Sequence, residues 1–124
     1  MKADTICKVV SIDFDEVLSV VKETILNDGF LIIHEINPQQ ILASYQIETL
    51  RIRQVLFFHP KFMKEIIQHD PSAIIEAPLK YVISEIDNER TMITSFNLDT
   101  HFKGYHNLEP LVTKLKESIS ELQF

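Results

Sequence analysis

Histidine is the side chain best suited to proton transfer or metal binding near neutral pH, and this chain contains five of them. Zinc sites commonly use closely spaced ligands, such as two histidines four residues apart on a helix. No pair in this sequence has that spacing. We therefore predict no metal site and no cofactor, unless folding brings distant histidines together. The five are His34, His59, His69, His101 and His106.

His59 is the most informative of the five histidines. It follows an apolar run over residues 55–58, which predicts a buried strand, and it precedes Pro60, which suits the first position of a helix. Ligand-binding groups are often found where strands end. The alternative interpretation is that His59 caps the helix or lies half-exposed at the edge of the sheet. We favour this alternative because no catalytic motif surrounds His59.

Three further polar residues flank the start of a strand at Pro78. Glu76, Lys80 and Tyr81 could line a pocket beside His59, although lysine in a strand is more often simply solvated. We take these three and His59 as candidate ligand-binding residues, and we identify no catalytic residue. The phenylalanines at 57, 58 and 62 are more typical of a core than of an aromatic binding platform.

Several classes of active site are absent from the sequence. The only glycines are Gly29 and Gly104, so neither a glycine-rich phosphate loop nor a dinucleotide fingerprint can form. There is no Gly-x-Ser-x-Gly elbow. Cys7 is the only cysteine, which excludes an intrachain disulfide and fits a reducing cytoplasm. Whether the protein is an enzyme stays open at this point.

Composition narrows the range of partners. The 124 residues suit a single domain, 1–124, and 18 acidic residues outnumber 12 basic ones for a net charge of -6. Binding to nucleic acid or to an anionic membrane needs clustered Lys and Arg, so we expect neither partner. Charges at Asp4 and Lys8 interrupt any signal-peptide core, and no apolar run approaches the ~20 residues of a membrane helix. We expect a soluble, cytoplasmic protein.

The first half of the chain predicts two strands and a strongly marked helix. Residues 5–12 alternate as a half-buried strand, and Asp13 then caps a helix that ends at Gly29. Residues 30–36 form a second strand whose two faces both begin apolar, which predicts a central position in the sheet. Pro38 then opens a short helix.

The second half begins with a strand over residues 52–58 and a helix that starts at Pro60 and stops at Pro71. Residues 72–77 form a connection whose apolar pair, Ile74 and Ile75, should be packed. Residues 79–86 and 91–96 predict a hairpin, followed by a polar loop over residues 97–105. Asn107 is then expected to cap a final helix with an apolar stripe that extends to residue 122.

This order predicts an α+β fold, with a mainly antiparallel five-stranded sheet and helices packed on one face. Three main helices cannot easily cover both faces of such a sheet, although strand residues such as Leu31 and Val55 suggest apolar groups on both. A homodimer would cover the second face. Our first hypothesis is therefore a self-associating binding or interaction module. The alternative is a small-ligand-binding protein or enzyme with a pocket near His59 and the strand that starts after Pro78.

Several short motifs resemble the family named domain of unknown function 302 (DUF302). The resemblance covers nearly the whole chain, and it implies a compact α+β fold with one curved antiparallel sheet, of the type grouped with the TATA-binding protein. It implies no activity, because function depends on sites rather than on folds. The matching residues are Phe58-His59-Pro60, Asp70-Pro71, Ala77-Pro78 with the hairpin after it, the helix from Asp13 to Gly29, and Asn97-Leu98-Asp99.

The chain also departs from the pattern of that family. Many members have a cysteine before an Asn-Pro pair that matches His59-Pro60, and another just after the proline that matches Pro78. This chain has Phe58 and Leu79 at those positions, and His59 replaces the asparagine. Any redox or metal chemistry that those cysteines carry in other members is therefore unavailable to this protein.

Overall fold

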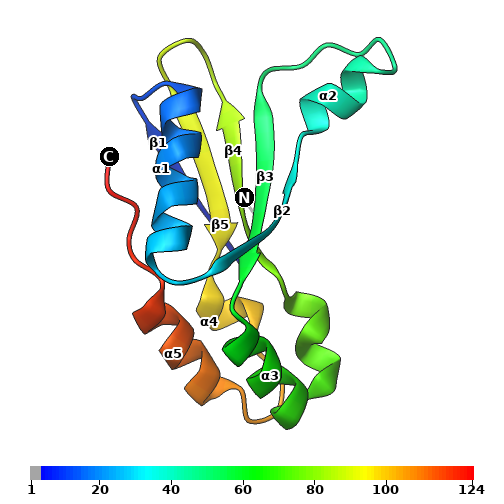
Figure 1. Cartoon of the computed structure of the whole chain (residues 1–124), viewed down its shortest axis with the longest axis vertical. Coiled ribbons are helices and arrows are strands. Elements are labelled where there is room, and N and C mark those ends of the chain that lie inside the picture. Colours follow the sequence, from blue (N-terminus) through cyan, green and yellow to red (C-terminus); the bar gives the residue numbers. More distant parts are fainter. Residues whose placement is uncertain (1–3) are drawn as a thin grey trace.

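The computed structural model describes residues 4–124 and has one open, antiparallel five-stranded sheet (Figure 1). The strand order is β1-β5-β4-β3-β2, which places β4 at the centre. The predicted α+β fold is confirmed, and the predicted bounds of β3 and β5 match those observed. The strands are β1 (Thr5–Val10), β2 (Leu31–Ile36), β3 (Ile52–Phe58), β4 (Leu79–Glu85) and β5 (Thr91–Phe96).

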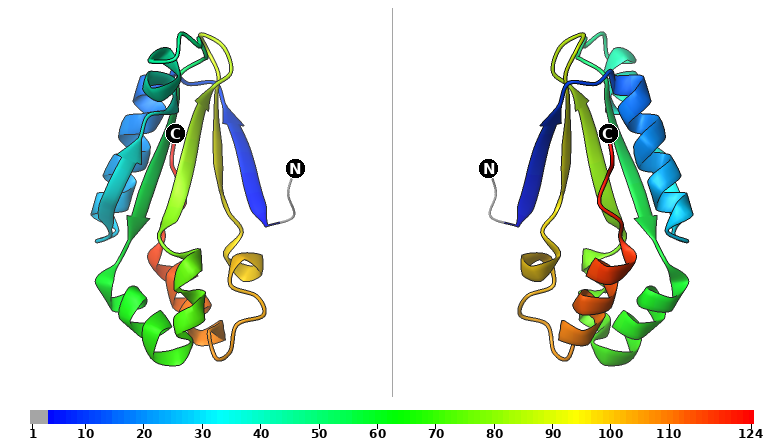
Figure 2. Two further views of the ribbon diagram at one scale, coloured as in Figure 1. Left: turned by 90° about the vertical axis from the view of Figure 1, so that its right-hand side faces the viewer. Right: turned by 90° about the vertical axis from the view of Figure 1, so that its left-hand side faces the viewer.

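The helices lie on one face and at one end of this sheet. The longest, α1 (Phe14–Asn27), packs on the sheet against β2, β3 and β4. The others gather beyond one end of the strands, except for α2, which lies beside β3 (Figures 1 and 2). They are α2 (Pro38–Ala43), α3 (Pro60–His69), the 3₁₀ helix η1 (Pro71–Glu76), α4 (Leu98–His101) and α5 (Glu109–Ser118).

Helix α1 forms where its sequence signals predict. The side chain of Asp13 caps it by accepting a hydrogen bond from the backbone N–H of Asp15 at 3.0 Å. Val17, Val21 and Ile25 follow helical spacing and are buried against the sheet. The helix ends just before Gly29, whose φ of 83° lies in the left-handed region that glycine adopts without strain.

One part of the core lies between α1 and the sheet face that α1 covers, called here the inner face, and the core continues among the helices at the end of the strands. Leu79, Tyr81 and Ile83 on the central strand β4 are buried on this face, because alternate residues of a strand point to the same side. Val55 and Phe57 of β3 are their direct neighbours in the ladder. The intervening residues of β4 are only partly buried, so the sheet is packed on one face.

Two predictions about apolar segments were wrong. Strand β2 was expected at the centre of the sheet but forms its edge, and Leu31 is 53% exposed. Among the described residues, no helix covers the apolar side chains of β2 on the side of the sheet opposite α1. The pair Ile74 and Ile75 was expected to be packed, but it lies in η1, where Ala73 is the buried residue and Ile75 is 78% exposed.

The segment before the last helix also differs from its prediction. The loop predicted over residues 97–105 contains α4, because the side chain of Asn97 caps a short helix by accepting from the N–H of Asp99. Asn107 does not cap α5: its φ is 60°, and Leu108 occupies the cap position without a side-chain hydrogen bond. Helix α5 ends at Ser118, earlier than the apolar stripe suggested.

Residues 119–124 leave α5 and run back along the inner face, beside the strands that α1 does not cover (Figure 2). Ser120 fastens this C-terminal segment to the end of α1. Its N–H and its hydroxyl both donate to the carboxylate of Asp28, at 2.8 and 2.5 Å. The inner face is thus covered by α1 over one half of the sheet and approached by the C-terminal segment over the other.

Thr91 of β5 is hydrogen-bonded to the segment just before α1, and this contact can be tested by mutation. Its side chain is fully buried, and its hydroxyl donates to the backbone carbonyl of Ile12 at 2.7 Å. Replacing it by the isosteric valine, Thr91→Val, leaves that carbonyl without its donor. We expect the free energy of unfolding, measured by urea denaturation, to fall by about 1–2 kcal/mol. The matched control Thr94→Val, on the opposite and more accessible face, should change it by less than about 0.5 kcal/mol.

Candidate functional site

His59 lies between β3 and α3, as predicted, and it acts there as the helix cap. Its Nδ1 accepts a hydrogen bond from the backbone N–H of Lys61 at 3.0 Å. The ring makes edge contacts with Phe30 and Phe62, with centroid distances of 5.9 and 5.8 Å. One ring nitrogen is therefore committed to the helix, and the ring lies against the core.

Glu76 and Lys80 do come together, in a pocket of about 380 Å³ at the start of β4. The pocket opens on the face of the sheet opposite α1, called here the open face. Sequence reasoning identified Glu76 and Lys80 as candidates but did not single out His101 or Asp4, the other two ionisable residues that line this pocket. The lining residues are Asp4, Leu56, Ile75, Glu76, Ala77, Pro78, Lys80, Phe96 and His101.

The imidazole of His101 is held firmly in place. Its Nε2 lies 2.8 Å from the backbone carbonyl oxygen of Glu76, and its ring stacks on Phe96 with centroids 4.0 Å apart. The side chain is only 7% exposed. Because a carbonyl oxygen can only accept, Nε2 carries the proton, and Nδ1 is left as an acceptor in the neutral ring. Nδ1 has no hydrogen-bond partner among residues 4–124.

The carboxylate of Glu76 is oriented by Tyr105, whose hydroxyl donates to Oε2 at 2.6 Å. The other oxygen, Oε1, lies 3.9 Å from Nε2 of His101. The hydrogen bond to the negatively charged carboxylate raises the pKa of Tyr105, because the protonated phenol is the donor. Nζ of Lys80 reaches Oε1 of Gln54 at 3.3 Å. The pocket is thus lined by an imidazole, an ammonium group and two carboxylates, those of Glu76 and Asp4.

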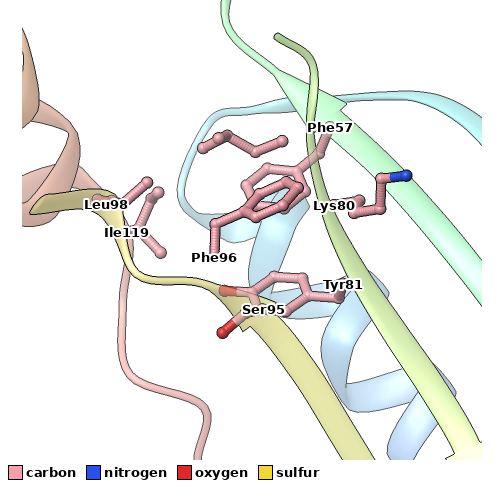
Figure 3. Close-up of a pocket in the computed structure, with 8 residues that line it drawn as sticks. Phe57, Lys80, Tyr81, Ser95, Phe96, Leu98 and Ile119 are labelled. Carbon is pink, nitrogen blue, oxygen red and sulfur yellow. The ribbon is translucent and has the colours of Figure 1, made fainter. Parts of the chain in front are cut away.

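Tyr81 belongs to a different site, on the inner face. Its ring stacks on Phe57 with centroids 5.0 Å apart and planes 9° apart, and the side chain is 7% exposed. Burial raises the pKa of Tyr81 to about 12, because the phenolate would lose its hydration. It lines a second, smaller pocket of about 110 Å³ with Ser95 and Phe96, from which the ammonium group of Lys80 points away (Figure 3).

The structure therefore divides the four candidate ligand-binding residues among three places. Glu76 and Lys80 share the pocket on the open face, Tyr81 lines the pocket on the inner face, and His59 caps α3. Among residues 4–124, no three histidine, cysteine, aspartate or glutamate side chains are grouped closely enough to hold a metal ion. Over the same residues, no helix has the length and hydrophobicity to cross a bilayer.

The titration of Tyr81 gives a prediction for alkaline pH. The pKa in the folded protein, about 12, lies above the ordinary value of about 10, so folding favours the protonated phenol. This contribution to stability is present below pH 10 and is lost as the pH rises toward 12. We expect wild-type protein to lose about 2 kcal/mol more unfolding free energy over this range than Tyr81→Phe does.

The measurement is guanidinium denaturation at several alkaline pH values, with phenolate absorbance followed in parallel. The variant Tyr105→Phe serves as a control for the other tyrosine with a raised pKa. If the unfolding free energies of wild type and Tyr81→Phe depended equally on pH, the raised pKa of Tyr81 would be contradicted.

Comparisons with known proteins agree with this architecture. No curated protein sequence matches the chain. The crystal structure of an uncharacterized conserved DUF302 protein from Bacillus stearothermophilus superposes with a TM-score of 0.81, at 12% sequence identity, over 95% of this chain and 94% of that one. At that identity the likeness shows a shared fold. A sequence model of the family, described as domain of unknown function DUF302, matches residues 6–123. Since that match spans nearly the entire sequence, the chain belongs to the DUF302 family.

Proposed function

We propose that this protein is an interaction module that forms a homodimer through the open face of its sheet. The observation that carries the proposal is the one-sided packing of the sheet. Helix α1 and the C-terminal segment lie on the inner face, and no described helix lies in front of the open face (Figure 2).

The open face has the composition of an interface core. Lys80 is the only Asp, Glu, Lys or Arg that points to this side from the described strands, in a chain where such residues make up 24%. Depletion of charge is the compositional signature of the buried centre of protein interfaces. The apolar side chains on this face are Val9, Leu31, Ile36, Ile52, Leu56, Val82, Met92 and Phe96, each exposed or half-exposed.

The area of the face is sufficient for a dimer. Five strands of six or seven residues cover a flat area of roughly 500 Å², from the spacing between strands and the rise along them. The accessible surface over corrugated side chains exceeds the flat area. Two such faces together bury more than the ~1,000 Å² that a specific interface requires.

A second copy of the chain is the occupant that the charges favour. The chain carries a net charge of -6, so two copies repel each other over most of their surface. None of the acidic residues in the described strands points to the open face, because Glu35 and Glu85 lie on the inner side. Two copies that meet through this face therefore keep the acidic residues of their strands apart, and Asp4 and Glu76 are the acidic residues of the pocket that opens on it. Pairing of identical faces about a two-fold axis also closes the assembly at two.

The dimer is tested by a charge placed at the centre of the open face. We expect wild type to scatter light as a particle of twice the 14.4 kDa chain mass, and Val82→Asp to scatter as a single chain. Val82 lies on the central strand and is half-exposed, so the aspartate is tolerated in a monomer and desolvated in a dimer. Ile67→Asp, on an exposed position of α3, is the matched control and should remain dimeric. A wild-type protein that stays at 14.4 kDa at high concentration would rule the dimer out.

A second candidate function is the binding of a small polar ligand in the pocket of Glu76, Lys80 and His101. The specific observation is that the side chains of Asp4, Glu76, Lys80 and the fixed imidazole of His101 line one pocket of about 380 Å³. That volume lies at the lower end of the range for small-molecule sites.

This ligand is sought by a thermal-shift screen of metals, nucleotides, haem and common metabolites. A ligand at 100 times its dissociation constant stabilises the folded state by about 2.7 kcal/mol, which gives a clear shift in a domain of this size. We expect Lys80→Met to reduce the shift and Lys103→Met, at an exposed position away from the pocket, to preserve it. A ligand that shifts the melting temperature of Lys80→Met as much as that of wild type binds outside this pocket.

A further inference from the structure

A groove runs between the inner face of the sheet and the C-terminal segment. Its volume is about 390 Å³, and it adjoins the 110 Å³ pocket of Figure 3, because Tyr81, Ser95 and Ile119 line both. Helix α1 covers the other half of the inner face, so the groove occupies the half over β1 and β5. The two hollows therefore adjoin, and the 110 Å³ pocket is called here the inner pocket.

The walls of this site are mainly apolar. Ile6, Ile93 and Leu122 line the groove, and Phe57, Leu79 and Leu98 line the inner pocket. The inner pocket is close in size to engineered cavities of ~150 Å³ that accept benzene. An alkyl chain or a single aromatic ring therefore suits the size of the inner pocket.

Tyr81 supplies a hydrogen-bond donor that no described residue uses. Every fully enclosed side-chain nitrogen or oxygen among residues 4–124 has a hydrogen-bond partner. The hydroxyl of Tyr81 has none, although the side chain is more than nine-tenths buried, so that hydroxyl must open into the groove. Ser95 lies directly opposite Tyr81 in the ladder, and its hydroxyl lies on the same side of the pocket (Figure 3).

Lys8 adds a positive charge to the same site. It neighbours Ile93 in the ladder and points to the inner face, and its Nζ lies 5.7 Å from the ring centroid of Phe124. Lys8 forms no ion pair within residues 4–124. Two carboxylates lie in the same region. Asp28 is already held by the N–H and hydroxyl of Ser120, and Glu121 is exposed at the rim.

We propose that this groove binds a small monocarboxylate with an apolar body. The carboxylate accepts hydrogen bonds from the ammonium group of Lys8 and from the hydroxyls of Ser95 and Tyr81, all of which can donate. The apolar body lies along Ile93 and Ile119 and enters the inner pocket. This site is on the opposite side of the sheet from the proposed dimer interface, so the two proposals are independent.

Isothermal titration with octanoate tests the site. We expect saturable binding of one octanoate per chain, and weaker binding of the uncharged octanamide. Lys8→Met keeps the aliphatic stem and removes the charge, and Tyr81→Phe keeps the ring and removes the hydroxyl. Each should weaken binding, Lys8→Met by roughly tenfold or more, because a charge-assisted hydrogen bond is lost. Lys61→Met, an exposed lysine on α3, should bind as wild type does.

Three results would overturn the proposal. The first is the absence of saturable octanoate binding in a wild-type protein that is shown to be folded. The second is binding that is unchanged in both Lys8→Met and Tyr81→Phe. The third is binding that Val82→Asp abolishes while Lys8→Met does not, because this assigns octanoate to the open face. Amide chemical shifts of Tyr81, Ser95 and Ile119 provide a separate readout, since octanoate should perturb these residues and leave those of β2 unchanged.

Discussion

A single long helix has to cover a sheet of five strands, and most features of this molecule follow from that mismatch. A helix with its side chains is about 10 Å wide, whereas five strands span more than 20 Å. Helix α1 therefore packs against β2, β3 and β4 and leaves the inner side of β1 and β5 to other residues. The stripe of Val17, Val21 and Ile25 closes the core over only part of the sheet.

The remaining half of the inner face is bordered by an irregular segment instead of a second helix. Residues 119–124 are attached to α1 through Ser120 and Asp28, and a thin extended chain cannot fill the space that a helix would fill. A groove lined by the largely buried Tyr81 is the result. The opposite face has no covering layer among the described residues, which is why its apolar side chains stay partly exposed.

Much of the fold could be predicted because its signals are local. Asp13, Pro60 and Asp70-Pro71 mark the ends of helices through hydrogen bonds or missing N–H groups that depend on neighbouring residues alone. The position of β2 could not be predicted in this way. The sequence pattern of an apolar strand is the same at the edge of a sheet as at its centre. Strand order depends instead on pairing between segments that are distant in the sequence.

The candidate site was predictable in part for the same reason. Proximity to Pro78 identified Glu76 and Lys80, which share a pocket. Adjacent residues in a strand point to opposite faces, so the ammonium group of Lys80 and the ring of Tyr81 separate. His101 was not singled out, because its contact with Glu76 spans 25 residues and depends on where α4 packs.

The exposed edge of the sheet at β2 has a consequence for the addition of further strands. The register of β2 on β3 shifts between Ile32 and His34, as at a β-bulge. A shift of this kind disrupts the regular row of N–H and C=O groups that a flat edge offers to an incoming strand. β2 is therefore a poor template for the pairing of another strand along its free edge, despite its apolar side chains. Growth of extended β filaments from this edge is therefore disfavoured.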